Sequence, residues 1–145
     1  MKLVRNRILL IFIGILLLIM TSCGKQISGI KNADYAVVSF TIDPDAERYK
    51  FEGNDVEKII SLIKPETWRK GSLTLELSAI EHIIFYEGNT KYVVAIRDIE
   101  NNEVLFELYS ATDGKWNSDG GYYKTDDVGY KELMDALKEM CITEE

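Results

Sequence analysis

Apolar and polar residues alternate along much of this chain, and a period of two predicts β-strands with one buried face. Ala36, Val38, Phe40 and Ile42 begin the pattern, which ends at Pro44. Alternation or a β-branched and aromatic composition predicts further strands at residues 48–51, 73–77, 80–86, 92–99, 104–109 and 121–125. Short polar segments at residues 87–90 and 100–103 separate three of these strands, so residues 80–109 are predicted to form an antiparallel meander.

Two stretches carry a helical period instead. Val56, Ile59, Ile60 and Ile63 form one apolar stripe, predicted to start at a cap by Asn54 or Asp55 and to end before Pro65. A final helix is predicted after a cap by Asp126 or Asp127, with the stripe Leu133, Met134, Leu137, Met140 and Cys141. Trp68 follows the first helix and is expected to close one end of the core, the alternative being an exposed anchor for a partner.

These elements predict an α+β fold. Two amphipathic helices and the strands must bury their apolar sides against each other, and the simplest arrangement is a two-layer one. We therefore expect a single antiparallel sheet of about five to six strands with two helices packed on one face. The second face of the sheet is then partly open, and aromatic side chains exposed on it would favour a partner surface.

The first 23 residues have a different pattern. A basic start with Lys2, Arg5 and Arg7 precedes an apolar run of 13 residues from Ile8 to Met20, which is short of the ~20 residues that a membrane-spanning helix needs. The run ends in Met20-Thr21-Ser22-Cys23, which resembles the lipobox of bacterial lipoproteins. The resemblance implies cleavage before Cys23, a diacylglycerol on its thiol and a location on the outer face of the cytoplasmic membrane. An uncleaved membrane anchor is the alternative.

This interpretation divides the chain into a signal peptide (residues 1–22), a flexible tether (residues 23–34) and a single domain (residues 35–145). The signal peptide holds three of the 17 basic residues and none of the 24 acidic ones, which leaves the remainder with a formal charge of −10. Such a charge disfavours nucleic acid and anionic lipid headgroups as partners. We expect the lipid anchor, rather than the surface of the domain, to hold the membrane.

The glycine-rich loop at residues 113–121 contains the candidate binding residues. Trp116, with Tyr122 and Tyr123 of the following strand, is predicted either to form a recognition patch for a protein partner or to cover the end of the sheet. Asn117 and Asp119 match part of a calcium loop, but Lys115 occupies the first ligand position with the wrong charge. We therefore interpret the loop as turn chemistry and expect no metal and no cofactor.

Catalytic chemistry has little support in the sequence. His82 is the one histidine, so a zinc site of several His and Cys ligands is excluded. Cys141 lies on the apolar stripe of the final helix and is predicted to be buried, and with Cys23 lipidated it has no disulfide partner in the chain. No nucleophile elbow, phosphate loop or dinucleotide fingerprint is present.

The layout of strand, helix, meander and final helix, with Ile59-Ile60-x-x-Ile63 leading to Trp68, resembles small uncharacterised lipoprotein domains of Gram-positive bacteria. The resemblance implies no known activity. The leading hypothesis is a lipid-anchored extracytoplasmic interaction module at the cell envelope that engages a protein partner. The alternatives are a lipoprotein that binds a small ligand or a divalent cation and, third, an envelope hydrolase.

Overall fold

The computed structural model describes residues 26–41, 47–72 and 81–142. Within these residues, eight strands form one antiparallel sheet in the order β2-β1-β4-β5-β6-β8-β3, with β7 paired to β6. The strands are β1 (Tyr35–Ser39), β2 (Tyr49–Glu52), β3 (Arg69–Lys70), β4 (Glu81–Glu87), β5 (Thr90–Ile99), β6 (Glu103–Thr112), β7 (Lys115–Trp116) and β8 (Gly121–Lys124). Two helices, α2 (Asn54–Ile63) and α3 (Tyr130–Ile142), and a helical segment at residues 26–31 complete the fold.

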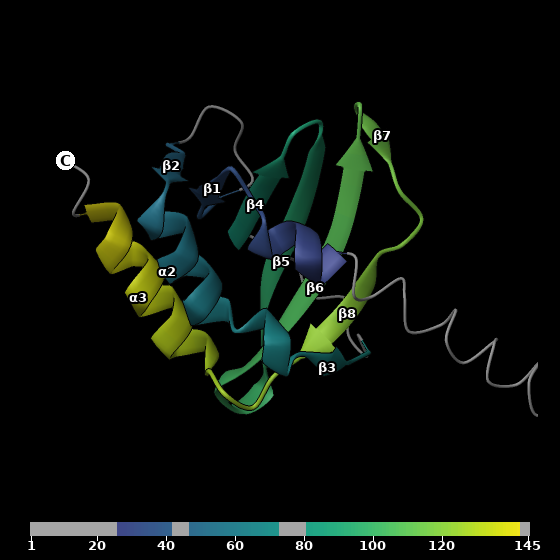
Figure 1. Ribbon diagram of the computed structural model, residues 1–145. Coiled ribbons are helices and arrows are strands. Elements are labelled where there is room, and N and C mark those ends of the chain that lie inside the picture. Colours follow the sequence, from purple (N-terminus) through teal and green to yellow (C-terminus); the bar gives the residue numbers. More distant parts are fainter. Residues whose placement is uncertain (1–25, 42–46, 73–80, 143–145) are drawn as a thin grey trace, which may run out of the picture.

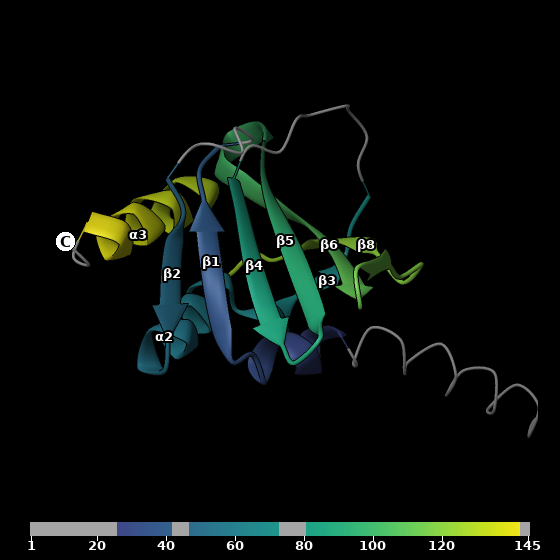
Figure 2. The same ribbon diagram turned by 90° about the horizontal axis from the view of Figure 1, so that it is seen from above.

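The helices lie together on one side of the sheet (Figures 1 and 2). The prediction of an α+β fold with a single antiparallel sheet is therefore confirmed. Its finer counts differ, because the described part of the chain has eight strands and three helices. Strands β3 and β7 have two residues each, which is too short for alternation to reveal them in the sequence.

The predicted meander is formed by β4, β5 and β6. Glu87 pairs with Thr90 across the first turn, where Gly88 has a φ of 54°. Such left-handed backbone conformations favour glycine and are the rule in two-residue hairpin turns. The second turn places Asn101 and Asn102 at φ 65° and 63°, which asparagine tolerates better than most residues. The turn residues thus explain why the strands reverse where they do.

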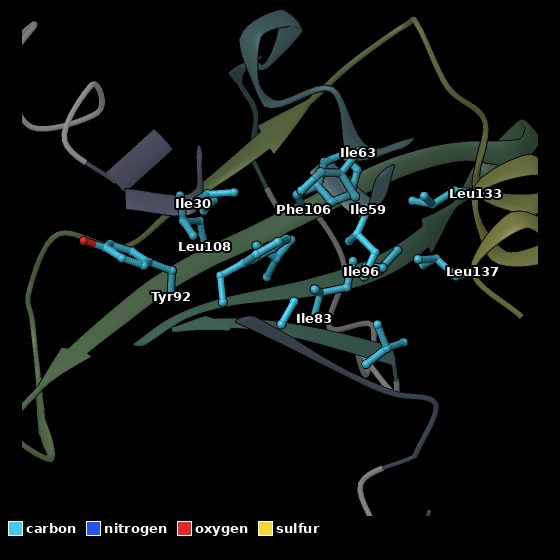
Figure 3. Close-up of a cluster of buried hydrophobic side chains, with 14 of the residues drawn as sticks. Ile30, Ile59, Ile63, Ile83, Tyr92, Ile96, Phe106, Leu108, Leu133 and Leu137 are labelled. Atoms are coloured by element: carbon cyan, nitrogen blue, oxygen red, sulfur yellow. The ribbon is translucent and has the colours of Figure 1, made fainter. Parts of the chain in front are cut away.

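The core fills the space between the sheet and the three helices (Figure 3). Phe106 of β6 is fully buried near its centre, with Ile59 and Ile63 of α2 above it and the ring of Trp68 stacked on it at a centroid distance of 4.5 Å. Leu133 and Leu137 of α3 cover the part of the sheet around Ile96, whereas Ile30 covers Leu108 and Tyr92 at the opposite end. Trp68 closes the core as predicted, and its Nε1 donates to the carbonyl of Ile63 at 2.7 Å.

Both predicted helix caps are wrong. Gly53 precedes α2 without any side-chain cap, and Asp55 instead pairs with Lys58 at 2.6 Å. Helix α3 begins at Tyr130, later than predicted, and the side chain that binds its free amides comes from elsewhere in the sequence. The Oδ1 of Asn102, in the β5–β6 turn, accepts from the amide of Lys131 at 2.7 Å. Asp126 pairs with Arg69 at 2.6 Å instead.

The predicted flexible tether at residues 23–34 is also wrong where the structure describes it. Residues 26–31 are helical, and Gln26, Gly29 and Ile30 are buried. Gly29 lies so close to Tyr92 that a Cβ built on it would be 2.0 Å from the ring. The absence of a side chain at Gly29 therefore lets this segment lie directly on the sheet. The segment belongs to the folded domain rather than to a linker.

Some predictions fall outside the described residues. They are the lipidation site at Cys23, the end of the first strand at Ile42 and the strand with Leu73, Leu75 and Leu77. In the part of the chain that the structure does describe, no helix combines the length and the apolar character required to cross a membrane.

Candidate functional site

The core face of the sheet changes from apolar to polar at one end of β5 and β6. Val94 and Leu108 are paired across the two strands and belong to the core. The next residues on the same face are Tyr92, paired with Ser110, and then Thr90, paired with Thr112. Four adjacent hydroxyl groups thus continue the face on which the helices pack.

These hydroxyl groups line a pocket of about 330 Å³. The helical segment contributes one wall, and the loop between β7 and β8 contributes another. The lining residues are Gln26, Thr90, Tyr92, Ser110, Thr112, Asn117, Ser118 and Asp119. This pocket, which we call the polar pocket, is at the lower end of the size range of small-molecule sites.

Ser110 organises the loop side of the polar pocket. Its hydroxyl is buried, donates to Oδ1 of Asp119 at 3.1 Å and accepts from Nδ2 of Asn117 at 2.9 Å. The backbone N–H of Asn117 also donates to the backbone carbonyl of Ser110 at 2.9 Å. The hydroxyls of Thr90 and Thr112 lie 3.1 Å apart and share a hydrogen bond. The loop is therefore held over β6 by a connected network, which is the preorganisation that a binding site requires.

Gln26 is the exception in this network. Its side chain is 1% exposed, and within the described residues neither Oε1 nor Nε2 has a hydrogen-bond partner. Burying an amide without partners costs about 1–3 kcal/mol, so such groups are rare in folded proteins. A donor and an acceptor are thus buried beside a polar pocket, where a small movement of the Gln26 side chain would let a bound polar molecule satisfy both.

Tyr92 forms the boundary between the polar pocket and the core. Its ring packs under Gly29, and its hydroxyl donates to Oε2 of Glu87 at 3.1 Å. Burial raises the pKa of the Tyr92 hydroxyl, and the hydrogen bond with Glu87 raises it further. Tyr92 therefore stays neutral at physiological pH and acts as a fixed wall.

Trp116 lies on the other face of the sheet. Its side chain is 61% exposed, its ring packs against Tyr109 at a centroid distance of 5.2 Å, and the Lys91 ammonium lies 4.9 Å from the ring centroid. Burial raises the pKa of Tyr109. Beside Tyr109, Arg97 and Glu107 form a largely buried ion pair. The exposed Trp116 and the half-buried Tyr109 and Lys91 form an aromatic and cationic surface, which we call the Trp116 patch.

The two tyrosines predicted to join Trp116 separate. Tyr122 pairs with Glu107 and is half-buried on the face of the Trp116 patch. Tyr123 points to the core, is 3% exposed and stacks with Trp68 at a centroid distance of 5.6 Å. The prediction that Tyr123 binds a partner is therefore wrong, because alternation along β8 turns neighbouring residues to opposite faces.

The candidate metal ligands serve the hydrogen-bond network. Asn117 and Asp119 both contact Ser110, as described above. In the described ranges, no three His, Cys, Asp or Glu side chains gather closely enough to hold a metal ion. Asp113 and Gly114 have φ values of 51° and 77° and form the β6–β7 turn, in agreement with the interpretation of this loop as turn chemistry.

The residues considered for catalysis lie apart from the pocket. His82 is in β4, paired with Ala95, and faces away from the helices. Cys141 is buried on α3, as predicted. Tyr130, which was not among the predicted site residues, also lies outside the pocket lining; burial and then the negative charge of Glu81 raise its pKa to about 12. Among the described residues, the lining of the polar pocket contains two serines, Ser110 and Ser118, and no histidine, so it does not form a nucleophilic site.

Sequence reasoning missed Gln26, Thr90, Ser110 and Thr112. A signal for three of them was present, because Ser110 and Thr112 continue the alternation of Val104, Phe106 and Leu108. Thr90 continues that of Tyr92, Val94 and Ile96 in the same way. Hydroxyl groups in phase with a buried stripe indicate where a core ends in a polar site. Gln26 had no comparable signal, since its burial depends on the close approach of Gly29 to Tyr92.

A scan against protein-family models, a search of curated proteins and a search of solved structures each found no match.

Proposed function

We propose that this chain is a lipid-anchored binding module on the outer face of a bacterial cytoplasmic membrane, attached through Cys23 and engaging a protein partner. The first part of the proposal is supported by the sequence Met1–Cys23, with its basic start, short apolar run and lipobox. The formal charge of −10 for the remaining chain agrees with attachment by lipid rather than by a basic surface.

The fold adds a geometric consequence to the proposed anchor. Gln26 is already part of the domain, and it follows Cys23 by three residues. Three residues of fully extended chain span at most ~11 Å. A lipid on Cys23 therefore holds the domain within about that distance of the bilayer surface, with residues 26–31 and the adjacent end of β5 and β6 nearest to it.

The observation that carries the binding function is the exposure of Trp116. Within the described residues, Trp116 and Ile142 are the large hydrophobic side chains that remain exposed. Trp116 is supported by Tyr109 and flanked by a cation, whereas Ile142 lies in the last turn of α3. Rigid exposed tryptophans are enriched at the centres of protein interfaces. The Trp116 patch is thus the proposed contact surface for the partner.

A second candidate function is supported by an independent observation. The polar pocket, whose buried Gln26 amide has no hydrogen-bond partner among the described residues, favours the binding of a small ligand. Both functions are compatible with one lipid-anchored protein, since the pocket and the Trp116 patch occupy opposite faces of the sheet. For the envelope hydrolase, the described part of the chain shows no supporting arrangement of residues.

The anchor is tested by the intact mass of the chain purified from its native membrane. We expect a mass without residues 1–22 and with a diacylglycerol on Cys23. Cys23→Ser is the matched control, because a hydroxyl cannot form the thioether, and it is expected to keep the signal peptide and to carry no lipid. A native protein that retains Met1 and carries no acyl chain would contradict the anchor.

The partner is tested by purification of the full chain with bound proteins from mildly solubilised membranes. Trp116→Ala should weaken the affinity for a specific partner at least tenfold, because a central tryptophan contributes about 2 kcal/mol or more to an interface. Ile142→Ala is the matched control, since Ile142 is 73% exposed but lies outside the Trp116 patch. An identical set of partners for all three proteins would argue against the Trp116 patch as the contact surface.

A further inference from the structure

The polar pocket has a chemical character that narrows its ligand. Among the residues that the structure describes, its lining provides hydroxyl groups, two side-chain amides and the carboxylate of Asp119, and no lysine or arginine. Anionic ligands are normally held by arginine or lysine, so phosphate and carboxylate ligands are disfavoured here. A divalent cation prefers several carboxylates, and Asp119 is the single one. The lining therefore suits a neutral ligand with many donors and acceptors.

The size of the pocket supports the same conclusion. A volume of about 330 Å³ accommodates one small ring compound rather than a peptide or a nucleotide. Hydroxyl groups, such as those of Thr90 and Thr112, both donate and accept, and Asp119 only accepts. The buried amide of Gln26 offers one donor group and one acceptor in a plane, which matches two neighbouring hydroxyls of a sugar ring.

We infer that the polar pocket binds a hexose, with the Gln26 amide as its central contact and Ser110, Thr112 and Asp119 around it. The inference about the ligand stands on the pocket alone. The origin of the ligand rests on the proposed function, because a domain anchored at Cys23 keeps the pocket near the bilayer surface. The hexose is then either a free sugar or the headgroup of a glycolipid, and the two share the same chemistry.

The first experiment measures sugar binding to the full chain by saturation-transfer NMR and calorimetry. The chain is kept in a zwitterionic detergent, because glucoside and maltoside headgroups would compete. The probes are glucose, galactose and N-acetylglucosamine. We expect at least one of them to bind with a Kd on the order of 1 mM, as the size of the ligand predicts. Failure of all three to bind at tenfold higher concentration would overturn the inference.

Variants connect the binding to the pocket. Gln26→Leu keeps the side-chain volume, removes the amide and is expected to weaken sugar binding at least tenfold while leaving the fold intact. Thr112→Val, which removes one hydroxyl without changing shape, serves as a second variant. Asn32→Leu is the matched control, because Asn32 is exposed near the end of the same helical segment. Equal sugar affinity in wild type, Gln26→Leu and Thr112→Val would place the binding elsewhere and overturn the inference.

Further arms separate the remaining possibilities. We expect no binding of calcium when calcium chloride is added alone. If the chain binds calcium but no sugar, and Asp119→Ala abolishes the calcium binding, the pocket is a cation site and the hexose inference is overturned. In proteoliposomes, added glucosyl-diacylglycerol should compete with free sugar if the headgroup is the natural ligand. An unchanged affinity for free sugar identifies the free form instead. If the chain binds sugar but its mass shows no lipid, the hexose site is supported and the anchor at Cys23 is contradicted. The two proposals can therefore fail independently.

Discussion

Phe106→Ala is expected to lower the free energy of unfolding by about 3–5 kcal/mol, which is the usual cost of removing a buried phenylalanine. Phe106 is fully buried where α2, Trp68 and β6 meet, and its ring stacks on Trp68. Domains of this size are stable by about 5–15 kcal/mol, so a large part of the stability is lost. Urea unfolding followed by far-ultraviolet circular dichroism measures the change.

Trp116→Ala is the matched control for Phe106→Ala. It also removes a large aromatic side chain from the β6 hairpin, but the Trp116 side chain is largely exposed. Surface substitutions usually change stability by less than about 0.5 kcal/mol, so the two variants should differ clearly in their free energies of unfolding. Similar losses for Phe106→Ala and Trp116→Ala would contradict the placement of the core described above.

The sequence predicts the parts of the fold that depend on local pattern. The meander follows from alternation and from turn residues such as Gly88, and the stripe from Val56 to Ile63 predicts α2. The caps could not be predicted, because the amide of Lys131 in the first turn of α3 is bound by Asn102, 29 positions away in the sequence. A helix end takes whichever polar group the tertiary fold brings to it, and local sequence is then a poor guide.

The candidate site shows the same division between local and distant information. Asn117 and Asp119 are partial matches to a calcium loop in the sequence, and in the structure they line the polar pocket. Their role there depends on Ser110, whose hydroxyl binds both side chains. The sequence predicts that Trp116 either binds a partner or covers the end of the sheet, and strand pairing decides that it faces away from the pocket. Which face a residue occupies depends on register, and the loop sequence does not specify register.

The N-terminal segment connects fold, site and proposed anchor. Ile30 completes the core over Leu108, Gln26 lines the polar pocket, and Cys23 precedes Gln26 by three residues. A segment that follows a lipid anchor is expected to be a polar linker, because a linker lets a domain move away from the membrane. Burial of Gln26 and Ile30 removes that freedom. If the chain is anchored through Cys23 as we propose, the occupancy of the pocket, the position of the segment and the distance of the domain from the bilayer are therefore coupled.

Gly29→Val is expected to detach this segment and to lower the free energy of unfolding by about 3 kcal/mol, at the upper end of the usual cost of overpacking. A Cβ at Gly29 would lie 2.0 Å from the Tyr92 ring. Ser28→Val is the control, since Ser28 is exposed on the same segment.

Tyr92→Leu shortens the opposing side chain, so Gly29→Val with Tyr92→Leu should be more stable than the two single losses predict. Urea unfolding, with hydrogen exchange at residues 26–31, tests this. Equal stability of Gly29→Val and Ser28→Val would mean that the segment does not pack on the sheet, and the polar pocket would then lose the wall that Gln26 provides.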